Sequence, residues 1–98
     1  MTSGVILVGL PPLFFAATLY HLVTGRAPFE GTVQQVLAAI GKVEPERADK
    51  VRPGLPIDLV AIIEKGMSPD LASRYQTADD LRQDLLAWLE FRPVAARR

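Results

Sequence analysis

The chain has 98 residues, of which 49% are hydrophobic and 22% are charged, a balance typical of one folded domain rather than of a disordered chain. Eleven basic residues balance eleven acidic ones, so no overall charge draws the molecule to nucleic acid or to an anionic membrane. The sequence has no cysteine and one histidine, which excludes disulfides, thiolate zinc sites and clusters of imidazole ligands, and we expect a cytoplasmic protein without a nucleic-acid partner.

An uncharged run at residues 4–23 dominates the first quarter of the chain. About 20 apolar residues can span a bilayer, so association with a membrane through this run is the alternative to a cytoplasmic location. Pro11 and Pro12 interrupt the run, however, and no basic residue precedes it as in a signal peptide. The pattern therefore favours an irregular piece at residues 5–8 and a helix at residues 13–24. Because that helix begins with five successive apolar residues, we expect it to be buried on every side.

The first predicted helix ends in a turn rich in glycine and proline. Gly25 stands where a helix is commonly closed by a residue in the left-handed conformation. Pro28 and Gly31 favour a compact turn, and Phe29 between them is expected to return to the core as an apolar plug. His21 lies in the apolar helix and is interpreted as a packed or rim side chain rather than as a general base.

A second helix is predicted at residues 32–42. Thr32 and Gln35 have the spacing of a capping box, in which each side chain bonds a free backbone N–H near the helix start. Gly41 marks the end of this helix, and the polar residues 44–54 are typical of a surface connection. One face of the helix is apolar and should be buried; it carries Val33, Val36, Leu37 and Ile40.

A third helix is predicted at residues 57–67. Pro56 suits the first turn of a helix, and Asp58 lies near the positive end of the helix dipole. The apolar residues that follow recur at helical spacing, so this helix should be well buried. Residues 68–74 are turn-like.

The last helix is predicted at residues 77–90, where Thr77 and Asp80 provide its N-terminal cap. Its two faces differ in polarity. We expect the apolar face to pack inward, with Leu81, Leu85, Trp88 and Leu89. We expect the other face to be solvated, with Arg82, Gln83, Asp84 and Glu90; Asp79, Asp80 and Asp84 are interpreted as ordinary first-turn and surface acids. Four helices without a strand signal predict an all-α fold.

Three blocks of the sequence resemble the helix F to helix I region of the C-terminal lobe of bacterial eukaryotic-like Ser/Thr protein kinases. They are A-T-L-Y-H-L-V-T-G-R-A-P-F-E-G, R-P-G-L-P-I-D-L-V-A-I-I-E-K-G-M and S-R-Y-Q-T-A-D-D-L-R-Q-D-L. The resemblance implies a four-helix remnant of such a lobe at residues 13–91. Residues 1–12 do not resemble the family, and residues 92–98 are expected to form a flexible tail.

The resemblance assigns family structural positions to Gly25, Pro28, Phe29 and Arg74. In that family the arginine matching Arg74 is buried and pairs with the glutamate of an Ala-Pro-Glu motif, which this sequence lacks. Because a buried unpaired guanidinium is costly, we expect Arg74 to reach solvent or one of two carboxylates, Asp70 or Asp79.

The motifs of kinase catalysis are absent from the sequence. These are the Gly-rich loop, the strand lysine, the His-Arg-Asp loop and the Asp-Phe-Gly motif, which position Mg-ATP in the complete family. We therefore expect an inactive, pseudokinase-like fragment, with no catalytic residue, metal site or cofactor in this chain.

Two other functions fit the same sequence. The chain could be a small interaction module that dimerises or docks through its apolar first helix, or a membrane-anchored fragment. In complete kinases the surface near helix G contributes to docking of substrates and regulators, so the resemblance implies an interaction surface here at Gln34, Gln35 and Ala38.

Overall fold

The computed structural model describes residues 10–29, 31–32, 34–35, 38 and 45–97 of the chain. The piece predicted at residues 5–8, and most of the helix predicted at residues 32–42, lie outside this part. Where the structure describes the chain it is helical and contains no strand, which confirms the all-α prediction. The helices are α2 (Leu10–Thr24), α4 (Ala48–Val51), α5 (Ile57–Gly66) and α6 (Ala78–Leu89), with 3₁₀ turns η1 (Leu71–Ser73) and η2 (Ala95–Arg97).

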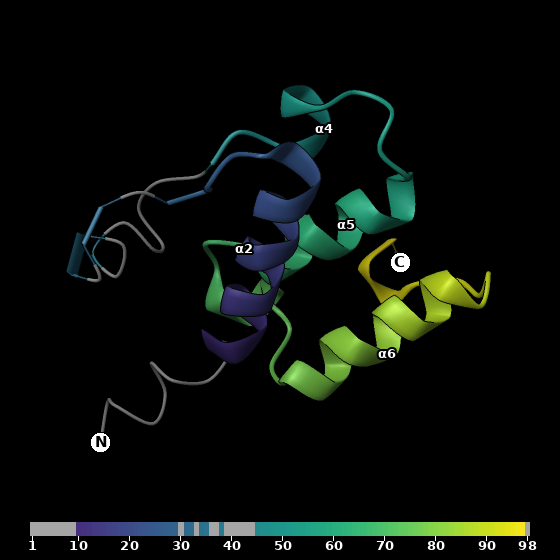
Figure 1. The fold of residues 1–98 in the computed structure, drawn as a ribbon. Helices are drawn as coiled ribbons and strands as arrows, with labels where there is room; N and C mark the ends of the chain where they lie inside the picture. Colours follow the sequence, from purple (N-terminus) through teal and green to yellow (C-terminus); the bar gives the residue numbers. More distant parts are fainter. Residues whose placement is uncertain (1–9, 30, 33, 36–37, 39–44, 98) are drawn as a thin grey trace, which may run out of the picture.

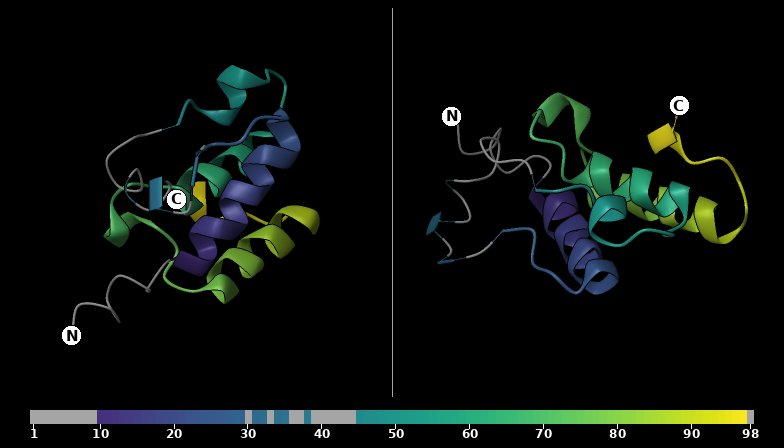
Figure 2. Two further views of the ribbon diagram at one scale, coloured as in Figure 1. Left: turned by 60° about the vertical axis from the view of Figure 1, so that its left-hand side comes forward. Right: turned by 90° about the horizontal axis from the view of Figure 1, so that it is seen from above.

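Helix α5 is the centre of the molecule. It packs against α2, α4, α6 and η2, and Figure 1 shows these elements arranged around it. The views in Figure 2 place α2 and α6 side by side, with the C-terminal turn returning to α5. The predicted helix at residues 57–67 is confirmed to within one residue, and Pro56 is its N-cap.

The core consists of two clusters that meet at α5. The first joins α2, α4 and α5, and its buried members are Leu13, Ala16, Tyr20, Ala48, Leu59, Ile63 and Met67. The second joins α5 to the last third of the chain, and its buried members are Ile62, Tyr75, Leu81, Ala87 and Val94. Because the adjacent residues Ile62 and Ile63 enter different clusters, α5 is buried on two sides.

Helix α2 begins three residues earlier than predicted and includes Pro11 and Pro12 in its first turn. The first N–H groups of a helix have no acceptor within it, so proline costs little there. The predicted end is confirmed. Gly25 adopts a φ of +73°, and its N–H donates to the His21 carbonyl at 2.8 Å.

The connection between Phe29 and α5 contains an element that the sequence did not indicate. Residues 48–51 form the short helix α4, and Ala48 in it is fully buried against the first cluster. Tyr20 of α2 donates its hydroxyl hydrogen to the Glu46 carbonyl at 2.5 Å, just before α4. A single buried alanine and a backbone acceptor leave no periodic pattern in the sequence, so this docking was not predictable from it.

Helix α6 begins as predicted, with the Asp80 N–H donating to Thr77 Oγ1 at 3.0 Å. Leu81 is buried, and Leu85 and Trp88 are partly buried, as the apolar face requires. Leu89 is 63% exposed, so its placement on that face is wrong. It lies about 100° around the helix axis from Trp88, which takes it out of the buried stripe.

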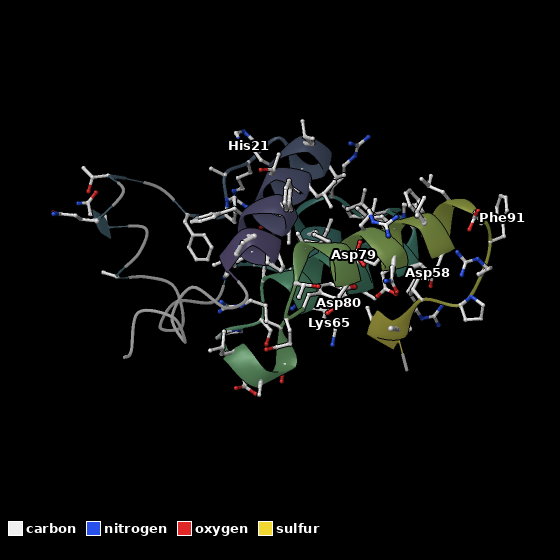
Figure 3. The ribbon with its side chains drawn as sticks, turned by 90° about the horizontal axis from the view of Figure 1, so that it is seen from below. His21, Asp58, Lys65, Asp79, Asp80 and Phe91 are labelled. Carbon is white, nitrogen blue, oxygen red and sulfur yellow. The ribbon has the colours of Figure 1, made fainter. Side chains whose placement is uncertain are left out.

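The end of α6 is a Schellman motif with phenylalanine in the position that usually holds glycine. Arg92 N–H donates to the Ala87 carbonyl at 2.7 Å, and Phe91 N–H donates to the Trp88 carbonyl at 3.2 Å. Phe91 has a φ of +59° and is 97% exposed, and Figure 3 shows its ring pointing away from the end of α6. Its Cβ atom therefore strains the backbone at this position, and its exposed ring makes little apolar contact that could compensate for the strain.

Replacing Phe91 with glycine should raise the free energy of unfolding by about 1 kcal/mol, because glycine adopts a positive φ without a clash at Cβ. The midpoint of thermal unfolding, followed by circular dichroism, measures the gain. Phe91→Ala is the matched control, since it removes the ring but keeps Cβ, and should leave the midpoint close to that of the unchanged chain. Equal gains in both variants would show that the ring, not the backbone, is the source of the strain.

The predicted flexible tail is docked over residues 94–97. Val94 is 2% exposed in the second cluster, and η2 packs on α5. Arg97 pairs with Asp58 at the start of α5, at 2.8 Å between Nη1 and Oδ1. The expectation of a flexible tail is therefore wrong for residues 94–97, because a buried valine and polar contacts to two helices hold this segment.

Candidate functional site

The two sides of α2 differ sharply in burial. Leu13, Ala16 and Tyr20 are buried in the first cluster. Phe14 and Phe15 are 49% and 56% exposed, and Leu22 is 73% exposed. The prediction of a helix buried on every side is therefore wrong: in the described part of the chain, α4, α5 and α6 pack against α2 and leave these side chains uncovered. An exposed apolar face of this kind is a candidate for an interaction surface.

A groove of about 540 Å³ lies between α2 and α6 beside this face. Most of its lining is apolar; the residues are Phe15, Thr18, Leu19, Ala78, Asp79, Leu81, Arg82 and Leu85. The charges at its rim are neutralised, since the Asp79 carboxylate accepts hydrogen bonds from Arg82 at 2.7 Å and Gln83 at 2.8 Å. The bond from Arg82 lowers the pKa of Asp79. Such a groove suits apolar side chains rather than a charged ligand.

A second hollow, of about 260 Å³, lies between α2 and the loop at residues 27–29. Phe14 and His21 line it from the helix, and Phe29 lines it from the loop. Phe29 is partly buried against the first cluster, which confirms its predicted return to the core. Phe15 thus lines the groove beside α6, and Phe14 lines the second hollow beside Phe29. Two neighbouring aromatic residues of α2 therefore lie at two separate concave surfaces.

The predicted capping box is formed. Thr32 N–H donates to Gln35 Oε1 at 2.8 Å, and Gln35 N–H donates to Thr32 Oγ1 at 3.2 Å. Gln34, Gln35 and Ala38 are helical and exposed, as an interaction surface would require. Gln35 also stabilises its own helix, so its side chain is not available to a partner without loss of the cap.

Arg74 is expected to reach solvent or the carboxylate of Asp70 or Asp79, and the first of these outcomes is wrong, because the side chain is buried. It is 5% exposed, and its Nε donates to the Ser68 carbonyl at 3.0 Å. Burial lowers the pKa of the guanidinium, and the negative charge of Asp70 opposes this shift. The Asp70 carboxylate itself accepts hydrogen bonds from Ala72 N–H and Ser73 Oγ, which close the turn η1.

Asp84 is buried, so its interpretation as a surface acid is wrong. Its Oδ2 accepts a 2.5 Å hydrogen bond from the Tyr75 hydroxyl and one from Ala96 N–H at 3.0 Å. Its Oδ1 accepts from Ala95 N–H at 2.7 Å. Three donors compensate for the loss of solvent at this carboxylate. No pattern in the sequence indicates this role, because the donors are a hydroxyl nine residues away and the backbone of the docked tail.

The buried phenol of Tyr75 should make the free energy of unfolding fall at high pH. Burial, helped by the hydrogen bond to Asp84, raises the pKa of Tyr75 above its ordinary value of 10.0. The unfolded chain therefore loses this proton at lower pH than the folded chain, so the stabilisation is fully present below about pH 10 and is lost as the pH rises further. We expect the free energy of unfolding to fall by up to about 1.4 kcal/mol per pH unit above 10 from this group.

Urea unfolding between pH 8 and 11.5 measures this dependence, with Tyr75→Phe as the comparison. The variant should lose part of the slope above pH 10. It should not lose all of it, since burial also raises the pKa of Tyr20. Identical slopes in the two proteins would contradict the assignment to Tyr75.

The structure does not bring His21 together with the first-turn acids of α6. Figure 3 shows His21 on α2 well apart from Asp79 and Asp80 on α6, and all three are exposed. No group of three or more metal-ligating side chains occurs among the described residues. None of the helices that the structure describes is long and apolar enough to cross a membrane.

The sequence is similar to segments of known bacterial kinases. It is 36% identical over 63 residues to the serine/threonine-protein kinase PknE of Mycobacterium tuberculosis, a match that covers 64% of this chain and 11% of the kinase. It is 38% identical over 80 residues to a protein of Streptomyces coelicolor named probable serine/threonine-protein kinase, covering 80% of this chain and 12% of that protein. The serine/threonine-protein kinase PknB of Mycobacterium leprae is 33% identical over 73 residues, 69% of this chain and 11% of the kinase. No model of a protein family matches the chain.

Proposed function

Since this chain is homologous to a segment of bacterial serine/threonine-protein kinases, we propose that it serves as the helical base of a kinase C-terminal lobe and carries out no phosphoryl transfer itself. The chain spans only 11–12% of the length of these relatives. In this proposal the catalytic motifs, and the Mg-ATP that they position, belong to a part of a kinase outside the 98 residues.

The exposed face of α2 is the observation that carries the proposal. Phe14 and Phe15 are about half exposed, and each lines a recess, Phe15 the groove beside α6 and Phe14 the hollow beside Phe29. Covering two half-exposed aromatic rings removes much apolar surface from water, which favours association with another apolar element. A neighbouring part of a kinase lobe would supply that element.

Arg74 supports the same proposal. A buried guanidinium whose pKa is lowered by burial gains from a further carboxylate. The resemblance assigns this carboxylate to the glutamate of an Ala-Pro-Glu motif. We propose that the remainder of a kinase brings such a group to Arg74.

Complementation of a split kinase tests the proposal. A bacterial relative is truncated where its similarity to this chain begins, and the chain is added in trans with Mg-ATP and a protein substrate. We expect phosphorylation to return with the unchanged chain, whereas the chain alone incorporates no phosphate. The double variant Phe14→Asp, Phe15→Asp should fail to restore activity, because charge on this face opposes burial.

Ile57→Asp is the matched control. Ile57 is also an exposed apolar residue, at 65%, but it lies at the start of α5, where an acidic side chain suits the helix dipole. This variant should restore activity as well as the unchanged chain does. The proposal fails if the unchanged chain restores nothing, or if the double variant restores as much.

The second candidate function is self-association through the same face. The exposure of Phe14, Phe15 and Leu22 favours it, because apolar surface without a partner tends to pair with itself. Light scattering after size-exclusion chromatography would show a dimer that becomes a monomer in the Phe14→Asp, Phe15→Asp variant. A monomer at the highest attainable concentration would contradict this candidate and leave the kinase proposal unaffected.

A further inference from the structure

The C-terminal turn is held by one side chain of α6. Asp84 accepts the N–H of Ala95 on one carboxylate oxygen and the N–H of Ala96 on the other, at 2.7 and 3.0 Å. It thereby satisfies two successive donors at the start of η2, which has no acceptor of its own for them. The same carboxylate accepts from Tyr75, so one residue joins α6, the chain before α6 and the chain end.

The segment also makes apolar contacts and one ion pair. Val94 is buried in the second cluster with Ile62 and Tyr75, and Ala96 is partly buried against the same cluster. The ion pair between Arg97 and Asp58 is largely exposed, with side-chain exposures of 50% and 28%, and an exposed pair contributes little. Attachment thus depends mainly on Val94, Ala96 and the Asp84 carboxylate.

The chain entering the segment is well suited to act as a hinge. Helix α6 has already ended in its Schellman motif, and Arg92 and Pro93 between that motif and Val94 are exposed. Detaching residues 94–97 therefore breaks no hydrogen bond within α5 or α6. Regions with few buried contacts open at lower free energy than the core around them.

We infer that residues 94–97 form a latch, held by Asp84, that opens as a unit while the helices stay folded. Opening exposes to solvent the part of the second cluster that Val94 covers, which includes Ile62 and Tyr75. It also returns the Asp84 carboxylate to solvent.

Amide hydrogen exchange of the full chain, followed by NMR, tests the inference. In the unchanged protein the amides of Ala95 and Ala96 should exchange at least tenfold faster than those of Ile62 and Ile63, and with a weaker dependence on denaturant. Asp84→Asn leaves one acceptor oxygen where there were two, so it should speed exchange at Ala95 and Ala96 about tenfold further. Asp80→Asn makes the same charge change at an exposed position on α6 and should not alter these two amides.

A second variant keeps the test decisive if Asp84→Asn does not fold. Ala95→Pro removes one of the two N–H donors and leaves Asp84 and Tyr75 in place, so exchange at Ala96 should rise several-fold. The inference is overturned if Ala95 and Ala96 exchange as slowly as Ile62 and Ile63 in the unchanged protein. It is also overturned if the variant that folds leaves the exchange of the Ala96 amide unaltered.

Discussion

Replacing Ile63 with alanine should lower the free energy of unfolding by about 2–5 kcal/mol, the largest effect that we expect from a single substitution in this chain. Ile63 is fully buried on α5 and packs in the first cluster with residues from α2 and α4. Truncation leaves a cavity at the place where three helices meet. A small domain has a total stability of the same order, so the variant should be partly or wholly unfolded at 25 °C.

Urea unfolding followed by circular dichroism measures the loss, and α5 offers a matched control. Ile57 is in the same helix but 65% exposed, so Ile57→Ala should change the free energy of unfolding by no more than about 0.5 kcal/mol. Ile63→Val, which removes one methyl group, should fall between the two. Similar losses for Ile57→Ala and Ile63→Ala would show that the core does not lie where the structure places it.

The second large effect is expected at the crossing of α2 and α5. A Cβ atom added to Gly66 would lie only 2.4 Å from the Cβ of Ala16. Both atoms belong to helices, so the helices themselves must move apart. Gly66→Ala should therefore lower the free energy of unfolding by about 1–3 kcal/mol, even though alanine favours the helix more than glycine does.

A double-mutant cycle checks this crossing. Ala16→Gly removes the opposing methyl group, so the double variant should be more stable than the sum of the two single losses predicts, by about 1 kcal/mol or more. The thermal or urea midpoints of the four proteins give this coupling energy. Strictly additive losses would mean that Gly66 and Ala16 are not in contact.

The sequence predicts those features that depend on local chemistry. The caps at Gly25, Thr32 and Thr77 are formed as their residue types and spacing indicate, because each involves atoms only three or four residues apart. The start of α5 after Pro56 follows from the same reasoning. The order of these elements also agreed with the resemblance to a kinase lobe.

The errors concern features that depend on distant parts of the chain. An apolar run shows that Phe14 and Phe15 avoid water, but not whether 98 residues supply enough surface to cover them. Asp84 looks like a surface acid in the pattern of α6, since its donors lie outside that helix. The burial of Arg74 was missed because a backbone carbonyl, which has no sequence signature, accepts its hydrogen bond.

The contacts near Glu46 tie together two points of the chain that are 20 residues apart. Arg26 pairs with the Glu46 carboxylate at 3.4 Å, the Glu46 carbonyl accepts from Tyr20, and Arg52 donates to the Val23 carbonyl at 3.0 Å. A loop whose ends are fixed in this way contributes closure entropy that grows only with the logarithm of its length, about 0.6 kcal/mol for each doubling. Lengthening the stretch between Arg26 and Glu46 should therefore cost little closure entropy, as long as Phe29 keeps its place against the first cluster.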